Sequence, residues 1–342
     1  MKKKKKKKKK FYQKVIDYLK EEYKFLLLCA LIVFIGLYRL PYNIYTGGGI
    51  LDINDRVTVV DGYSSKGSFN MAYVDELGAT IPTYLLSYIF NWDVEPVSES
   101  LVDENDTTSD LWKRERIYLE NSNDNAIINA YHLAGLDIKI NKVEVVVLYI
   151  SSEAKTDLEI GDVIISVDNH EVVDDQELIR YMDNYQVGDK VKVKVLRDGK
   201  EKECQAELID VSGKAKIGIA LNLKYDYKID REIKLNFKRN EAGPSAGLML
   251  TLEIYNQLVS EDLTKGYKIA GTGTIDIYGN IGTIGGIKYK IKGANNSDAK
   301  IFFVPEGNYE EKKKKKNENN YKIELVKVST VADAINYLKE MK

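Results

Sequence analysis

The sequence has few of the residues that metal sites and disulfide bonds need. Its 342 residues include two cysteines and two histidines. Because Cys29 lies in an apolar run near the N-terminus, Cys204 has no partner for an intrachain disulfide. His132 and His170 do not belong to a cluster with metal-ligand spacing. We therefore expect no metal ion and no other cofactor, and stability that comes from packing.

The sequence also lacks a phosphate-binding loop, and it has no net basic charge outside residues 1–24. No segment reads G-x-x-x-x-G-K-[ST], because the glycine-rich stretch 282–288 is followed by Tyr289. Residues 1–24 hold twelve lysines and three acidic residues, which leaves 39 basic and 49 acidic residues in the remainder. We expect no ATP-driven motor in this chain and no nucleic-acid partner, since phosphate binding requires a basic surface.

Long uncharged runs are scarce, and the clearest one spans residues 25–38. As a helix it covers about 21 Å, less than the roughly 30 Å of a bilayer core unless it continues to residue 42. Nine lysines at 2–10 favour a cytoplasmic N-terminus. We predict a cytoplasmic basic tail at 1–24, a single-pass transmembrane signal anchor at 25–42 in the cell membrane, and an extracytoplasmic remainder. A buried core helix and a cleaved signal peptide are the alternatives.

The predicted extracytoplasmic N-terminal region, 43–134, carries no recognisable chemistry. Apolar residues at helical spacing predict one helix over 81–90 and another from Leu111 that Gly135 closes. Between them, the acidic and polar stretch 93–110 is typical of a solvated loop.

Short strands with Gly-Asp turns follow. Within 151–203, "VDNHEV" predicts a hairpin, "DDQELIRYM" a helix capped by Asp174 or Asp175, and the Asp-Gly turn at 198–199 a two-stranded ribbon. This order of elements resembles a PDZ domain, which we place at 135–212. The resemblance implies that extended peptides bind as an added strand, often through a C-terminal carboxylate. A small β-rich domain without a ligand is the alternative.

A serine in an unusual setting stands in the segment 240–250, "NEAGPSAGLML". Apolar residues that recur after Ser245 predict a helix to about Leu258, and Pro244 suits its first turn. If Gly243 is the cap, the Ser245 hydroxyl is not needed for capping and lies among unpaired backbone N–H groups that favour an oxyanion. From these residues alone, Ser245 is either part of an ordinary helix start or a nucleophile.

A nucleophilic serine needs a base, and both histidines lie in other segments. Lys288 follows the pair Gly285-Gly286 and opens a predicted helix. Its amine becomes a candidate base if burial lowers its pKa from about 10.4. Thr272, in a glycine-rich strand, is a candidate to orient that amine. We expect Lys290 and Lys292 to be solvated charges.

Together, the two motifs resemble the proteolytic domain of the Lon family. The resemblance covers about 215–342, includes "AKIFFVPEGN" and "VSTVADAINYLKEM" as a closing strand and helix, and departs from the family by an insertion at 309–320. It implies that Ser245 is the nucleophile and that Lys288, the first lysine after the Gly-Gly pair, is the base. The separation of 43 positions is like that of the family. We place the proteolytic domain at 213–342.

The sequence therefore predicts an α+β chain with an N-terminal transmembrane helix, a β-rich PDZ-like domain and a C-terminal Lon-type α/β proteolytic domain. Its resemblance to membrane-anchored PDZ-Lon proteases of bacteria implies an ATP-independent serine endopeptidase with a Ser-Lys dyad. Substrates would be flexible peptide or unfolded protein segments that the PDZ domain presents; membrane lipid is a second partner, and a homo-oligomer is left open.

Two alternative functions remain at this stage, a catalytically inert, membrane-tethered PDZ adaptor and a hydrolase of non-peptide amides. The sequence also leaves open whether the PDZ-like part is inserted into the proteolytic domain. In that case the strands near Val57 and Phe69 would pair with strands that follow residue 210.

Overall fold

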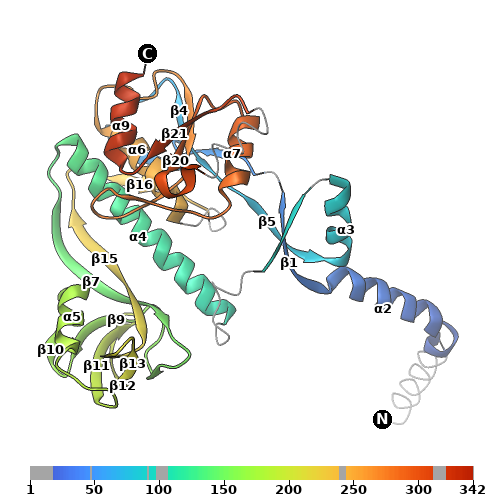
Figure 1. The fold of residues 1–342 in the computed structure, drawn as a ribbon, viewed down its shortest axis with the longest axis horizontal. Coiled ribbons are helices and arrows are strands. Elements are labelled where there is room, and N and C mark those ends of the chain that lie inside the picture. The colour runs from blue at the N-terminus through green and yellow to red at the C-terminus, as the bar shows by residue number, and fades with distance from the viewer. Residues whose placement is uncertain are drawn as a thin grey trace, which may run out of the picture. The chain divides into compact units, whose positions relative to one another are not determined.

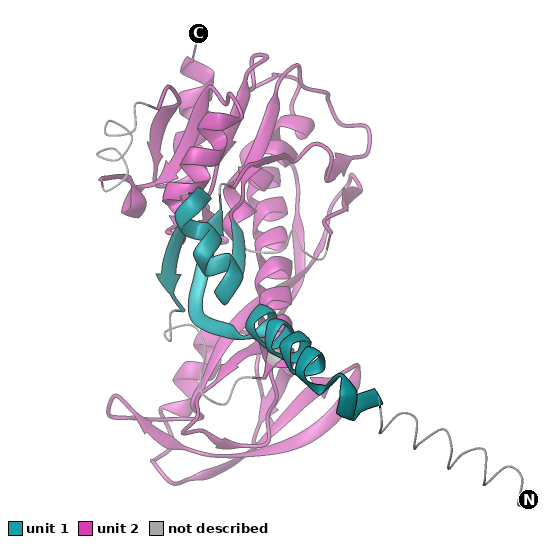
Figure 2. Ribbon diagram, turned by 90° about the vertical axis from the view of Figure 1, so that its right-hand side faces the viewer, with its two compact units in different colours: residues 1–47, 75–97 teal, residues 48–74, 98–342 magenta. Residues whose placement is uncertain are grey.

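The computed structural model describes residues 18–46, 48–90, 92–97, 107–238, 244–310 and 321–341. The chain divides into two compact units, each built from two separate stretches of sequence. The first contains residues 1–47 and 75–97, and the second contains residues 48–74 and 98–342 (Figures 1 and 2).

The first unit is a small antiparallel sheet with two apolar helices. Its central strand β1 (Arg39–Thr46) pairs with β5 (Asp75–Thr80) on one side and with β6 (Asp93–Pro96) on the other. Helix α2 (Tyr23–Leu37) precedes β1, and α3 (Ile81–Phe90) follows β5. The bounds of α3 confirm the predicted helix. The loop predicted to begin at Asp93 is wrong over β6, because these residues pair with β1.

Helix α2 is shorter than the predicted membrane span. It has 15 residues and ends at Leu37, and residues 39–42, which we expected to extend it, belong to β1. Pro41 explains the change, since a proline disfavours helical geometry at the residue before it. Among the described residues, no helix is both long and apolar enough to cross a membrane. The predicted transmembrane helix at 25–42 is therefore not supported.

The second unit contains a mixed five-stranded sheet in the order β2-β4-β17-β20-β21. Strands β4 (Ser68–Ala72), β17 (Lys268–Gly271), β20 (Ile301–Pro305) and β21 (Glu324–Val328) run parallel, and β2 (Ile50–Asp52) is antiparallel at the edge. A parallel strand covered on both faces needs apolar residues throughout. The sequence of β20, "IFFVP", meets this requirement, and all five residues are buried.

Helices cover both faces of this sheet. Phe303 of β20 joins the core cluster of α6 (Gly247–Leu258), whereas its neighbour Phe302 joins that of α7 (Ile287–Asn296). Successive side chains of a strand point to opposite faces, so the two helices lie on opposite sides. All twelve residues of α6 are buried, and its last residue is Leu258, as predicted. Helix α9 (Val331–Glu340) contributes Ile335 and Leu338 to the α6 cluster.

A second sheet is inserted between helix α4 (Thr108–Ala134) and strand β16 (Ile233–Leu235). Its strand order is β15-β7-β9-β11-β12-β8, with β10 beside β9. The strands are β7 (Lys139–Ile150), β8 (Lys155–Thr156), β9 (Val163–Val167), β10 (His170–Glu171), β11 (Lys190–Arg197), β12 (Lys200–Glu207) and β15 (Ile219–Lys228).

The predictions for the caps of two helices and for one turn are confirmed. Helix α5 (Asp175–Met182) is capped by Asp174, whose carboxylate accepts the backbone N–H of Glu177. Strands β11 and β12 form an antiparallel ribbon that turns between Arg197 and Lys200, as the Asp-Gly pair predicted. Gly135 caps α4 with a left-handed backbone, which suits a glycine.

The PDZ-like part is inserted into the proteolytic part, an arrangement that the sequence left open. Strand β3 (Val57–Val59) pairs with β16, and β4 pairs with β17, so strands before the second sheet pair with strands after it. The linear division into 43–134, 135–212 and 213–342 therefore differs from the structure. Pairing between segments so far apart leaves no local pattern in the sequence, which is why the division missed it.

Candidate active site

Ser245 lies in a short 3₁₀ turn, Pro244–Ala246, immediately before α6. Pro244 thus opens this turn, and the α-helix itself begins at Gly247. The predicted cap, Gly243, lies outside the described residues. The first N–H groups of a helix have no acceptor within the helix, and this end of the helix dipole favours an anion. The turn is therefore placed to stabilise negative charge beside the Ser245 side chain.

Two hydrogen bonds hold the turn against the central sheet. The carbonyl oxygen of Ser245 accepts the backbone N–H of Gly273 at 2.9 Å and the hydroxyl of Thr272 at 3.0 Å. Gly247 lets α6 approach closely, since a Cβ built there would lie 2.7 Å from a methyl carbon of Ile275 and 3.0 Å from the Ser122 hydroxyl. The second glycine of "GPSAG" is thus explained by packing.

The amine that reaches Ser245 belongs to Lys290. Its Nζ lies 2.9 Å from the Ser245 Oγ and 3.1 Å from the Thr272 Oγ1. The side chain is 7% exposed, so our expectation of a solvated Lys290 is wrong. The structure does not bring Lys288 to the serine, and we correct the assignment of the candidate base from Lys288 to Lys290.

Helix geometry explains why only one of the two lysines faces the serine. Positions 288 and 290 differ by about 200° around a helix axis. Lys290 shares the buried face of α7 with Ile287, Ile291 and Ala294, which pack against the sheet. Lys288 instead places its ammonium 4.6 Å from the centre of the Tyr289 ring. The apolar stripe at spacings of three and four was the signal that could have identified Lys290 from sequence.

Burial changes the chemistry of this lysine. Removal from water disfavours the charged amine and lowers the pKa of Lys290 to about 8. Thr272 is completely buried and makes two contacts at once, because it accepts from the Lys290 amine and donates to the Ser245 carbonyl. The predicted orienting role of Thr272 therefore concerns Lys290, and Lys288 is not involved.

A cleft of about 390 Å³ opens beside the turn. Its walls come from α4, from β15, from Pro244 and from the hairpin of β18 (Thr274–Ile275) and β19 (Ile281–Gly282). The Ser122 hydroxyl of α4 donates to the Pro244 carbonyl at 3.4 Å. A substrate segment in this cleft would lie next to the Ser245 turn.

Comparison with known families matches two parts of the chain. Residues 238–340 match the Lon protease (S16) C-terminal proteolytic domain, and residues 119–208 match the PDZ domain. The chain contains a Lon-type proteolytic domain. It also contains a PDZ domain. The Lon-type match includes Ser245, Thr272 and Lys290, whereas β2 to β4 and all of α4 precede it.

The curated relatives are Lon proteases. The chain is 30% identical over 120 residues to the Lon protease of Aster yellows witches'-broom phytoplasma, which covers 34% of this chain and 15% of that protein. It is 36% identical over 86 residues to that of Fusobacterium nucleatum, with coverages of 24% and 11%. For Campylobacter jejuni the identity is 34% over 96 residues, with coverages of 28% and 12%. The chain thus spans less than a sixth of these relatives.

The solved structures that resemble a part of this chain include two PDZ domains. The PDZ domain of the SdrC-like protein from Listeria monocytogenes is 28% identical, with a TM-score of 0.23, and covers 24% of this chain and 92% of that chain. The corresponding domain from Listeria innocua is 33% identical, with a TM-score of 0.22 and coverages of 23% and 92%.

We expect Lys290→Met to stabilise the fold at pH 7. The folded-state pKa of about 8 lies below the unfolded value of about 10.4. The buried ammonium therefore costs free energy below pH 8, and this cost disappears as the pH rises to about 10.4. After the loss of two hydrogen bonds, the gain at pH 7 should be on the order of 2 kcal/mol. Urea unfolding at pH 7 and at pH 10 measures it.

Lys288→Met is the matched control, because the same substitution there removes an amine that does not touch Ser245. It should change the free energy of unfolding little at either pH. A Lys290→Met effect that is the same at pH 7 and pH 10 would contradict a lowered pKa.

Proposed function

We propose that this protein is an ATP-independent serine endopeptidase that cleaves flexible peptide or protein segments with Ser245 and Lys290 as a catalytic dyad. The proposal is carried by one observation, the buried Lys290 amine at 2.9 Å from the Ser245 hydroxyl, inside the part of the chain that matches a Lon-type proteolytic domain. With a pKa of about 8, a useful fraction of this amine is neutral near neutral pH and can accept a proton.

In the proposed reaction, the Ser245 Oγ attacks the scissile carbonyl carbon while the Lys290 Nζ takes the hydroxyl proton. The tetrahedral oxyanion forms beside the N–H groups that begin the turn and α6. The Lys290 ammonium then gives its proton to the leaving amine, which leaves an acyl ester on Ser245. A water molecule that Lys290 deprotonates hydrolyses this ester. Thr272 acts as a positioning residue, because its hydroxyl joins the amine to the Ser245 carbonyl.

The substrate class follows from features outside the dyad. A PDZ domain in the same chain supports a peptide or protein substrate. The sequence has no phosphate-binding loop, so powered unfolding is not part of the proposal and cleavage is confined to flexible segments. A location outside the cytoplasm, with N-terminal attachment to the cell membrane, also belongs to the proposal. It rests only on the lysines at 2–10 and the apolar run 25–38.

Hydrolysis of an unstructured fluorogenic peptide by the purified protein tests the dyad. Ser245→Ala and Lys290→Met should each lower kcat/KM by at least about a thousandfold, because one removes the nucleophile and the other the base. Lys288→Met, the matched control, should stay within about threefold of the wild type, and ATP should have no effect. Wild-type activity in Ser245→Ala, or a loss in Lys288→Met equal to that in Lys290→Met, would refute this assignment.

The pH dependence gives a second test. Only the neutral amine of Lys290 accepts the serine proton, so kcat/KM should rise with pH and reach half of its plateau at about pH 8. The measurement is kcat/KM for one peptide from pH 6 to pH 10. A half-maximal pH near 10.4, the value of a solvated lysine, or a rate that falls as the pH rises through 8 would contradict the role of a buried Lys290.

A further inference from the structure

Helix α2 has an apolar surface around its whole circumference. None of its 15 residues is buried, and from Phe25 to Leu37 it contains no charged side chain. Leu31 and Val33 differ by about 200° around the helix axis, and both are exposed. A helix that is apolar on all sides needs an apolar medium on all sides. One protein partner covers a single face, so the medium that fits α2 is lipid.

Helix α3 shows the reverse of the usual amphipathic pattern. Its one buried residue is the polar Ser87, whereas Leu85 and Ile89 are 60% and 73% exposed. A spacing of four places these two side chains on one face, and Leu86 and Phe90 form a second exposed pair at the same spacing. No residue of α3 is charged. Because a helix on a water-soluble surface buries its apolar face, the exposed face of α3 is suited to lipid.

Aromatic side chains with polar groups gather around α3. The ring of Tyr84 lies 5.6 Å from the ring of Tyr42 on β1 and 5.6 Å from the ring of Tyr88, centre to centre. The Tyr88 hydroxyl donates to the Tyr84 hydroxyl at 3.1 Å. Trp92, just after the helix, stacks on Phe90 at 5.2 Å. Tyrosine and tryptophan are the side chains enriched where a bilayer meets water, so this cluster is typical of a membrane interface.

Basic residues flank α2. Residues 1–24 hold twelve lysines and three acidic residues, and Arg39 follows the helix. Arg39 pairs with Thr80, the residue before α3, so its charge lies where both apolar helices join the sheet. Asp75 lies at the opposite end of the same two strands, beside Thr46. Lysine and arginine next to an apolar helix attract anionic headgroups, and the charge of the first unit therefore favours an anionic bilayer.

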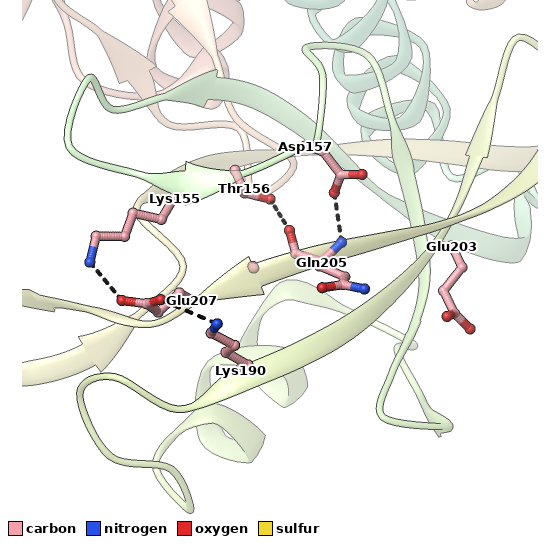
Figure 3. Close-up of a pocket in the computed structure, with 8 residues that line it drawn as sticks. Lys155, Thr156, Asp157, Lys190, Glu203, Gln205 and Glu207 are labelled. Atoms are coloured by element: carbon pink, nitrogen blue, oxygen red, sulfur yellow. Dashed lines mark hydrogen bonds and ion pairs between the residues drawn. The ribbon is translucent and has the colours of Figure 1, made fainter.

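A hollow on the inserted sheet shows, by contrast, a surface that is suited to water. It has a volume of about 400 Å³ and is lined by Lys155, Lys190 and Glu207 at the edge formed by β8 and β12 (Figure 3). Glu207 pairs with Lys155 at 2.6 Å and with Lys190 at 3.9 Å. Lipid over these charges would remove their hydration at a large cost in free energy. No such cost applies to α3, which has no charge to desolvate.

We propose that α3 is a second membrane-contacting element, which lies in the interface of an anionic bilayer. Its ten residues cover about 15 Å, half of a bilayer core of roughly 30 Å, so α3 lies in one leaflet and does not cross the bilayer. Leu85 and Ile89 enter the acyl region, and Trp92 lies at its boundary. This contact goes beyond the N-terminal attachment of the proposed function and is independent of the dyad. A single helical anchor can rotate about its axis, whereas a second contact fixes the orientation of the first unit on the membrane.

The two tryptophans of the chain are a matched pair of probes. The Trp92 N–H donates to the Ser87 carbonyl at 3.0 Å, which fixes Trp92 to α3, whereas Trp112 is 65% exposed on α4 in the second unit. In the full chain, Trp112→Phe leaves only Trp92, and Trp92→Phe leaves only Trp112. Each variant is reconstituted in vesicles of phosphatidylcholine and phosphatidylglycerol, with or without bromine on the acyl chains, which quenches tryptophan on contact. We expect bromine to remove about half of the Trp92 emission and less than about a tenth of the Trp112 emission.

A double variant, Leu85→Asn with Ile89→Asn, tests whether α3 itself makes the contact. Both side chains are exposed, so the change should leave thermal stability nearly unaltered. An amide in the acyl region is costly, and we expect the quenching of Trp92 to fall at least about threefold while the protein still sediments with the vesicles. Val187→Asn is the control, because it makes the same kind of change at an exposed apolar residue of the PDZ domain. It should leave the quenching of Trp92 unchanged.

The outcomes separate the contact of α3 from the N-terminal attachment. If the protein sediments with the vesicles but Trp92 is not quenched, or is quenched no more than Trp112, the contact of α3 is overturned and the attachment stands. Unchanged quenching in the double variant would also overturn it. A second copy of the chain on α3 would shield Trp92 from lipid, and analytical ultracentrifugation in detergent would then show an oligomer that the double variant dissociates. Protein that does not sediment with the vesicles would refute both the attachment and the contact.

Discussion

The burial of one amine, that of Lys290, is the constraint on which the candidate site depends. An ammonium in this position is costly, and the cost is met by the packing of the rest of α7. Ile287, Ile291 and Ala294 seal that helix against the sheet, where Phe302 and Val304 of β20 complete the cluster. The serine is fixed as firmly, because it immediately precedes a helix that is buried along its whole length. Helices α6 and α7, on opposite faces of one sheet, thus bring the Ser245 hydroxyl and the Lys290 amine within hydrogen-bond distance.

The inserted PDZ domain is joined to the proteolytic part by shared structural elements. Because the insertion lies between α4 and β16, the strands that enter and leave it, β7 and β15, extend out of the domain toward the proteolytic part. Helix α4 contributes to the core of the proteolytic part through Ala126 and Tyr131, and it also holds β15 through Asn121. The PDZ domain and the cleft therefore share structural elements, which a flexible linker between two separate domains would not provide.

Local features of the fold were accessible from the sequence. The bounds of α3, the end of α6, the Asp174 cap and the Asp-Gly turn of the β11-β12 ribbon all follow from short-range physics, in which period, capping and turn chemistry act over a few residues. The motif around Ser245 was visible for the same reason. The sequence assigns the base to Lys288 because that residue is the first lysine after the Gly-Gly pair. The buried helical face that holds Lys290 is the better signal. The strand at Asp93–Pro96 was missed because its partner β1 is distant in sequence.

The sequence by itself determined which parts the molecule has, a serine in a glycine-rich turn, a lysine-bearing helix and a peptide-binding β domain, because each is encoded in a short window. The tertiary structure alone decided which lysine meets the serine. It also decided that the proteolytic part is assembled from both sides of an insertion, and that β15 of the inserted sheet lines the cleft beside the Ser245 turn. These outcomes depend on burial and on strand pairing between distant segments, and neither leaves a local trace in the chain.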